Sequence, residues 1–100
     1  MSGFYLTAKA KEDLRSIGRY TEDTWGKPQR DKYLAMLDKA FHDVAKNPSS
    51  GRSCNDVRKG YRKYGMGKHM IFYRPVVNEI EIVRVLHERM DADGHLPEET

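Results

Sequence analysis

The side chains in this sequence that could carry out acid–base chemistry are histidines and tyrosines in its second half. Cleavage of RNA without a metal needs a base for the 2′-hydroxyl proton, an acid for the leaving 5′-oxygen, and cations for the charge on the phosphorane. The candidate acids and bases are His69, His87, Tyr64 and Tyr73. The candidate phosphate clamps are Arg58, Arg62 and Arg84. A charged stretch interleaved with aromatic residues can also bind nucleic acid by stacking and counterion release.

The same histidines also have a structural interpretation. His87 follows an apolar strand, which favours a packed, hydrogen-bonded residue at the strand end over an acid or base. His69 lies next to a turn, where a solvated or cross-strand role is the default. The segment after His87 is acidic and would repel RNA. We therefore expect a protein that performs no bond chemistry, and ribonuclease activity is the alternative.

The sequence offers no pattern for metal binding. Cys54 is the single cysteine, so neither an intramolecular disulfide nor a cysteine cluster for a metal can form. The four histidines lack a metal-ligand spacing such as HxxxH; they are His42, His69, His87 and His95. The methionines share no spacing that would indicate a cofactor site. We expect no metal and no cofactor.

Positive charge is concentrated in residues 52–78, which contain seven lysines or arginines and one acid. The whole chain has a net charge of only +3, so the remainder is net acidic. Such an asymmetry says more about a partner than the net charge does. Lysine and arginine on a strand can recognise an acidic partner, or they can protect a sheet edge from aggregation. Both interpretations remain open from the sequence.

The length of 100 residues indicates a single domain. We place it at residues 1–94 and expect residues 95–100 to be a frayed acidic tail, because Gly94 and Pro97 end regular structure there. The N-terminal sequence has no apolar run long enough for a signal peptide, and no stretch of 18 apolar residues indicates a membrane span. A cytoplasmic location is expected.

Two helices are predicted in the first half, after a short strand over residues 4–6. Thr7 suits the N-cap of a first helix, which ends at Gly26. Gly18 inside that helix indicates close approach of another backbone, and Trp25 is expected to plug the core. Pro28 suits the first turn of a second helix, which ends at residues 47–48 with a left-handed cap. The short linker forces an antiparallel helical hairpin.

Residues 57–91 are predicted to form three consecutive antiparallel strands, and residues 48–56 a loop before them. Residues 57–64 are mostly charged and fit an edge strand. Residues 80–86 are almost continuously apolar, which is typical of a strand covered on both faces. The fold class is therefore α+β: a short N-terminal strand and an antiparallel helical hairpin packed on a small, mainly antiparallel sheet, completed by a C-terminal three-stranded meander.

This order of elements, together with several short strings, resembles the RelE/ParE superfamily of bacterial type II toxins and in particular its ParE branch. LTAKAKEDLRSIGRYTEDTWG is similar to the first strand and helix of that family. GYRKY, GKHMIFYR, and VRVLHERMD followed by HL resemble its meander and C-terminal signature. The resemblance covers nearly the full length of the chain. Gly94 departs from the family pattern, in which a basic residue is common at that position.

The resemblance implies a toxin that inhibits DNA gyrase by protein binding, blocks replication, and stabilises a plasmid or chromosomal locus. It also implies neutralisation by a ParD-like antitoxin in a hetero-oligomer, without direct sequence-specific binding to nucleic acid and without a membrane. The alternatives are a RelE-like ribonuclease that cleaves messenger RNA on the ribosome, and an inactive binding module of the same fold.

Two sets of contact residues are expected on this basis. The gyrase-binding set is Arg62, Tyr64, His69, Arg84, His87, Arg89 and Met90. The antitoxin-binding set is Leu14, Ile17, Trp25, Arg58, Arg62, Lys63 and Tyr73. The antitoxin segment is expected to be acidic, to cover the cations of the meander, and to insert apolar side chains along the first helix.

Overall fold

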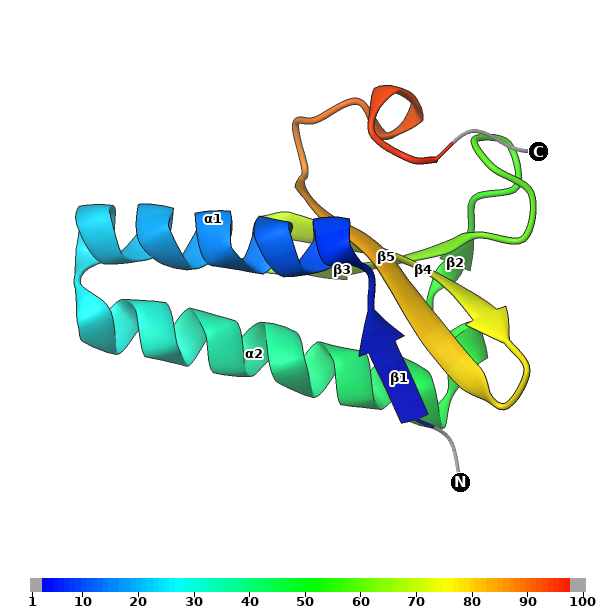
Figure 1. Ribbon diagram of the computed structural model, residues 1–100, viewed down its shortest axis with the longest axis horizontal. Coiled ribbons are helices and arrows are strands. Elements are labelled where there is room, and N and C mark those ends of the chain that lie inside the picture. The colour runs from blue at the N-terminus through cyan, green and yellow to red at the C-terminus, as the bar shows by residue number, and fades with distance from the viewer. Residues whose placement is uncertain (1–2, 98–100) are drawn as a thin grey trace.

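A computed structural model describes residues 3–97 of the chain. Figure 1 shows a long helical hairpin beside a twisted sheet, with the hairpin projecting past the end of the sheet. The elements in chain order are β1 (Gly3–Leu6), α1 (Ala8–Trp25), α2 (Lys27–Lys46), the 3-10 turn η1 (Pro48–Ser50), β2 (Arg52–Ser53), β3 (Arg62–Met66), β4 (His69–Val76), β5 (Glu79–His87) and the 3-10 turn η2 (Ala92–Gly94).

The ends of the two helices follow local sequence signals. The hydroxyl of Thr7 accepts a hydrogen bond from the Ala10 amide at 3.1 Å, so Thr7 is the predicted N-cap of α1. Gly26, at a φ of 92°, separates the helices, and Pro28 lies in the first turn of α2. The left-handed cap expected at the end of α2 is wrong: Asn47 has a φ of −138°, and the chain turns instead through η1.

The sheet has the order β1-β5-β4-β3-β2. β1 pairs in parallel with β5, and the other three pairings are antiparallel. The predicted N-terminal strand, helical hairpin and meander are therefore confirmed, and the sheet is mixed. β5 has a partner on each side and a core on each face, which explains its nearly continuous apolar sequence.

The main core lies between the helical hairpin and one face of the sheet. Leu37, Phe41 and Val44 of α2 are buried against Ile71 and Tyr73 of β4, together with apolar residues of β5. The helical hairpin therefore covers one face of the sheet, as predicted. In α1, Gly18 allows a close contact, because a Cβ there would lie 3.3 Å from the Cδ1 atom of Leu34. The neighbour is thus a side chain and not the backbone that the sequence had suggested.

A smaller core covers the opposite face of β4 and β5. Phe72, Val83 and Leu86 pack there beneath residues from the 54–61 loop and from the C-terminal segment. The pairing of β4 with β5 contains a register shift in this region. Tyr73 pairs with Ile82 and Phe72 with Arg84, so Val83 has no partner on β4. Leu96 is buried in this core, so the fraying expected from residue 95 is wrong for residues 95–97. Residues 98–100 of that expected tail lie outside the described residues.

Two further boundaries differ from the sequence prediction. The first strand of the meander begins at Arg62, because residues 54–61 form a turn-rich loop that the Cys54 amide closes with a 2.9 Å hydrogen bond to the Tyr61 carbonyl. The predicted loop at residues 48–56 contains β2, which pairs outside β3. The short strand β2, and not the charged stretch 57–64, is therefore the outermost strand at the edge opposite β1.

Candidate functional site

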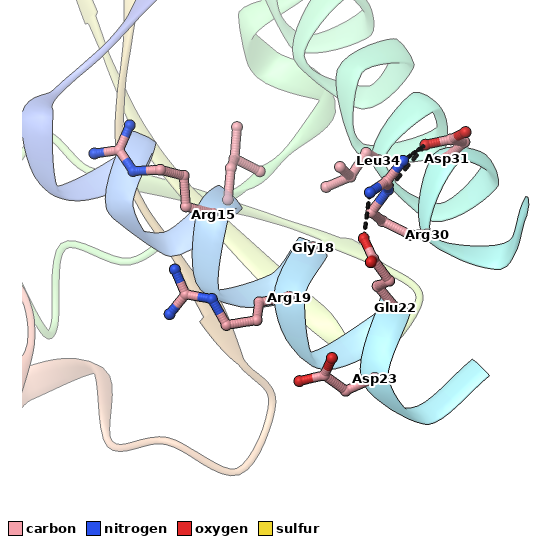
Figure 2. A pocket seen from close by; sticks show the side chains of 9 residues that line it. Arg15, Gly18, Arg19, Glu22, Asp23, Arg30, Asp31 and Leu34 are labelled. Atoms are coloured by element: carbon pink, nitrogen blue, oxygen red, sulfur yellow. Dashed lines mark hydrogen bonds and ion pairs between the residues drawn. The ribbon is translucent and has the colours of Figure 1, made fainter. Parts of the chain in front are cut away.

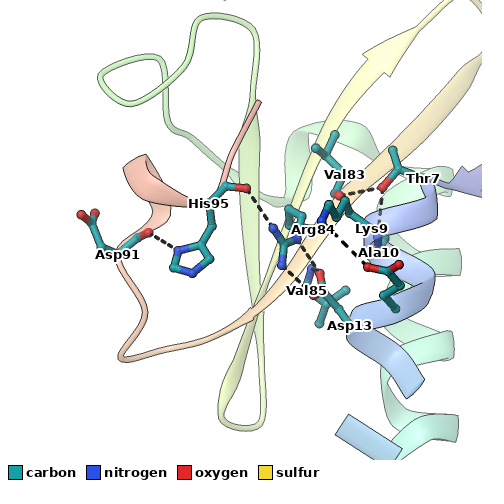
Figure 3. Close-up of polar contacts among 10 residues, drawn as sticks. Thr7, Lys9, Ala10, Asp13, Val83, Arg84, Val85, Asp91 and His95 are labelled. Carbon is teal, nitrogen blue, oxygen red and sulfur yellow. Dashed lines mark hydrogen bonds and ion pairs between the residues drawn. The ribbon is translucent and has the colours of Figure 1, made fainter. Parts of the chain in front are cut away.

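Arg84 joins three parts of the fold. Its Nε and Nη2 atoms donate to the two carboxylate oxygens of Asp13 on α1, both at 2.8 Å. Its Nη1 atom donates to the His95 carbonyl at 3.0 Å, and Asp13 also accepts the Val85 amide at 2.9 Å (Figure 3). The hydrogen bond to Asp13 raises the pKa of Arg84. Both side chains are at most 15% exposed, so Arg84 is committed to the fold.

Arg58 binds the C-terminal segment. It donates to the Asp93 carboxylate at 2.6 Å, to the Asp93 carbonyl at 3.0 Å and to the Pro97 carbonyl at 2.7 Å. The side chain is 13% exposed. These bonds hold Leu96 over the smaller core, in a segment that runs beside the 54–61 loop. Arg58 therefore anchors the chain end, a role that its sequence neighbours could not indicate.

Arg62 also bonds to its own chain. It donates twice to the Gly51 carbonyl, at 3.1 and 2.6 Å, and once to the Ser49 carbonyl at 3.4 Å. All three of the arginines considered as phosphate clamps thus have backbone or carboxylate partners. The meander cations Lys63 and Lys68 have no side-chain ion pair among the described residues.

His69 and His87 form a cross-strand pair on the helix side of the sheet. They are directly opposed in the β4–β5 ladder, and their ring centroids lie 5.5 Å apart. The Tyr33 oxygen, from α2, lies 2.6 Å from the His69 Nδ1 atom and accepts the Lys68 amide at 3.0 Å. Burial, and then the neighbouring His87, lower the pKa of His69. The structure therefore brings the two predicted histidines together.

Tyr33 is a member of this cluster that sequence reasoning missed. It lies in the second turn of α2. Its signal in the sequence was indirect: Gly67 leaves room for its ring, because a Cβ on Gly67 would lie 2.7 Å from the Tyr33 oxygen. The other two candidates lie elsewhere. Tyr73 is fully buried, donates to the Pro48 carbonyl at 2.6 Å and accepts the Gly51 amide at 3.0 Å. Tyr64 is half-buried against the main core.

A groove of about 670 Å³ follows the outer side of the helical hairpin. Figure 2 shows Gly18 and Leu34 in this groove, with Arg15 and Arg19 on α1 beside it. Arg15 and Arg19 have no ion pair with any described residue. At the far end, Arg30 forms ion pairs with Glu22 and Asp31. The groove thus offers an apolar floor, with Arg15 and Arg19 on its rim and the carboxylate of Asp23, which also has no ion pair with a described residue, beyond them.

Two helix residues expected to contact a partner are placed differently from each other. Ile17 is buried in the main core. Trp25 is 69% exposed, so its predicted role as a core plug is wrong. The reason is geometric: Trp25 is the last residue of α1, at the end of the hairpin that projects past the sheet (Figure 1).

The end of β5 presents a second exposed surface. His87 is the last residue of the strand, and Glu88, Arg89 and Met90 follow it in an exposed turn. Met90 is 47% exposed. The Met90 amide donates to the His87 carbonyl at 2.9 Å, which closes the turn. We call residues 87–90 the β5 turn.

Within residues 3–97, no three histidine, cysteine, aspartate or glutamate side chains are grouped closely enough to hold a metal ion. In the same residues, no helix is long and apolar enough to cross a membrane.

The fold described above is shared with toxins of bacterial toxin–antitoxin systems. A structure described as a chromosomal ParDE toxin–antitoxin system from P. aeruginosa superimposes with a TM-score of 0.74 at 20% identity, over 87% of this chain and 95% of the other. The RelBE2 toxin–antitoxin complex from Mycobacterium tuberculosis gives a TM-score of 0.60 at 21% identity, over 87% and 88%. At such identities the likeness establishes the fold alone.

Sequence comparison places the chain more finely. The family described as ParE toxin of type II toxin–antitoxin system, parDE, matches residues 4–92. Toxin ParE1 of Mycobacterium tuberculosis is 44% identical over 95% of this chain and 98% of its own length. Toxin ParE1 of Caulobacter vibrioides is 38% identical over 96% and 99%, and Toxin ParE of Escherichia coli 34% over 91% and 89%. The chain belongs to the ParE toxin family.

Proposed function

We propose that this toxin inhibits DNA gyrase by binding to it, and that a ParD-like antitoxin neutralises it. The observation that carries the non-enzymatic part is the commitment of Arg58, Arg62 and Arg84 to the fold. Charge stabilisation of a phosphorane requires cations aimed at the substrate, and these three guanidinium groups donate instead to carbonyls and to two carboxylates of the same chain. The relatives are named ParE toxins, which agrees with this assignment.

The proposed gyrase contact is the β5 turn with the adjacent His69. Arg89 and Met90 are exposed, and they follow a strand that is fixed on both sides and both faces. An exposed cation and an apolar side chain on a rigid base suit a protein docking surface. Arg62 and Arg84 are bonded to their own chain and Tyr64 packs against the main core, so these three residues, which the sequence had also suggested, are left out of this surface. Gyrase is a cytoplasmic enzyme, so the proposed site of action is the cytoplasm.

The proposed antitoxin contact is the groove along the helical hairpin. Leu14 and Leu34 provide a half-buried apolar floor, and Arg15 and Arg19, one helical turn apart, provide the charge for an acidic segment. An amphipathic helix with carboxylates along one edge matches this pattern. Trp25 at the projecting end is available to the same partner. Lys63 is left out of this surface, because it pairs with Phe72 and so lies on the sheet face opposite the hairpin. Ile17 and Tyr73 are buried, and Arg58 and Arg62 are bonded to the fold.

A supercoiling assay with purified gyrase tests the target. The Arg89→Ala/Met90→Ala double variant should inhibit gyrase more than tenfold less well than the unchanged toxin, if the two residues together contribute about 1.4 kcal/mol or more. Val77→Ala, which changes a residue 88% exposed in the β4–β5 turn, is the matched control. Both proteins should unfold at the same temperature. Cleavage of ribosome-bound message by the pure toxin, without gyrase inhibition, would establish the RelE-like alternative.

Titration with the cognate antitoxin tests the groove separately. Arg15→Glu/Arg19→Glu should weaken binding, and the unchanged pair should lose affinity as salt rises, because exposed charges are screened. Lys32→Glu, an exposed charge on α2 outside the groove, is the control. Affinity that is independent of salt and of both groove arginines would reject the acidic-helix assignment.

A further inference from the structure

The histidine at the base of the β5 turn is held as a hydrogen-bond acceptor. The Arg89 amide points at the His87 Nδ1 atom, with a nitrogen–nitrogen distance of 3.2 Å. A backbone amide can only donate, so this Nδ1 atom must be unprotonated, and a neutral His87 carries its proton on Nε2. The side chain thus supports the turn that the Met90 amide closes on the His87 carbonyl.

A second proton would convert this contact into a clash of donors. In the imidazolium form both ring nitrogens carry a proton, so the Nδ1–H group would face the N–H group of Arg89. The ring must then rotate, and the Arg89 amide loses its partner. The contact therefore responds to the protonation of a single ring.

The groups around His87 set the electrostatics of that step. His69 on β4 faces it at 5.5 Å, so charging both rings would be unfavourable. His69 is in turn held by Tyr33, whose oxygen lies 2.6 Å from the His69 Nδ1 atom and accepts the Lys68 amide. The carboxylates of Asp13 on α1 and of Glu88 act on the pKa of His69 in the opposite direction to His87. Asp13 is already paired with Arg84, which limits how far its negative charge can offset a positive charge on the histidines.

We propose that His87 is a pH-responsive support of the β5 turn, which is ordered while the ring is neutral and opens when the ring is protonated. The Glu88 amide still donates to the Lys68 carbonyl at 2.9 Å, so opening is confined to the turn beyond the strand. If the β5 turn contacts gyrase, which rests on the function proposed above, inhibition falls as the pH falls. The turn itself responds whether or not gyrase is the target.

Nuclear magnetic resonance of the free toxin tests the structural claim. The His87 ring and the amide resonances of Arg89 and Met90 should titrate with one common midpoint. His87→Asn is the matched variant, because an asparagine side-chain oxygen can accept the amide two residues on and does not titrate. Its Arg89 amide should be insensitive to pH across that range. His69→Gln removes the neighbouring titration and should leave the Arg89 response in place.

The outcomes separate this inference from the proposed target. An Arg89 amide that titrates equally in His87→Asn, or that follows the His69 midpoint alone, would overturn it. In the gyrase assay, the change in inhibition between two pH values is compared between the unchanged toxin and His87→Asn, and the pH dependence of gyrase cancels in that ratio. One unit below the midpoint about a tenth of the rings are neutral, so the unchanged toxin should lose about tenfold in inhibition relative to His87→Asn. A confirmed turn response without this loss would reject the β5 turn as the gyrase contact.

Discussion

The carboxylate of Asp13 accepts hydrogen bonds from both the Nε and the Nη2 atoms of Arg84, each at 2.8 Å, and so connects α1 to β5. β1 pairs with β5 only as far as Ile82, and beyond that residue the edge of β5 is covered by α1. The Thr7 hydroxyl donates to the Val83 carbonyl at 2.8 Å, and Asp13 accepts the Val85 amide (Figure 3). Side chains at the start of α1 thus bond to the backbone of β5 beyond the point where its pairing with β1 ends.

Arg84→Ala should reduce the free energy of unfolding by about 2 to 3 kcal/mol, because it leaves a largely buried carboxylate without its charge partner. Chemical denaturation measures this loss. Arg74→Ala is the control: Arg74 also forms an ion pair, with Glu81, but is 47% exposed, so its loss should cost less than about 1 kcal/mol. Equal losses in the two variants would show that the ion pair between Asp13 and Arg84 stabilises the fold no more than an exposed ion pair does. Loss of toxicity in Arg84→Ala should accordingly follow loss of folded protein.

Tyr73→Phe should destabilise the fold by about 1 to 3 kcal/mol, since it removes a buried hydroxyl that bonds both the Pro48 carbonyl and the Gly51 amide. The effect is read from thermal or urea unfolding. Tyr64→Phe serves as comparison, because the Tyr64 hydroxyl has no hydrogen bond to a described residue and should cost less than about 0.5 kcal/mol. A neutral Tyr73→Phe would mean that water replaces the hydroxyl without loss.

Two glycines with positive φ separate backbone strain from steric overlap. Gly60→Ala should lower the free energy of unfolding by about 1 to 2 kcal/mol, which is the strain of a left-handed conformation at alanine. No steric overlap is added, since nothing lies within 4 Å of the new methyl group. Gly67→Ala should cost clearly more, because the methyl group would lie 2.7 Å from the Tyr33 oxygen and must displace α2 or the β3–β4 turn. Parallel denaturation curves of the two variants give the difference. Similar losses would indicate that the Tyr33 ring moves freely.

The fold should lose stability on mild acidification through His69. Its pKa in the folded protein is lowered, chiefly by burial, so the unfolded chain takes up the proton at a higher pH. Stability from this source is complete above the ordinary histidine value of about 6.5 and declines as the pH falls from there toward the lower folded value. His69→Gln should flatten that part of the curve of unfolding free energy against pH. An unchanged slope in the variant would assign the dependence to other groups.

The helices and the buried strand could be predicted because their signals are local. Thr7, Gly26 and Pro28 act on neighbouring backbone groups, and the apolar run of β5 reports burial on both faces. The periodic apolar residues of α1 and α2 placed the hairpin against the sheet for the same reason.

The parts of the site that were missed depend on contacts between distant residues. No local pattern connects Tyr33 with His69, Asp13 with Arg84, or Arg58 with the Pro97 carbonyl. A cluster of arginines in sequence therefore suggested an open cationic surface, whereas folding directs several of those guanidinium groups inward. The prediction for Trp25 was wrong for a related reason. A large aromatic residue is usually buried, but Trp25 lies where the hairpin extends past the sheet.

The parallel pairing of β1 with β5 affects how the toxin is made. Tyr5 and its partner Glu81 are 76 positions apart, and the register joins the first strand of the described chain to the last one. During synthesis, β1 can find its place only after β5 has left the ribosome, and closing so long a loop delays folding. The strand that is synthesised first therefore cannot join the sheet until β5 is available.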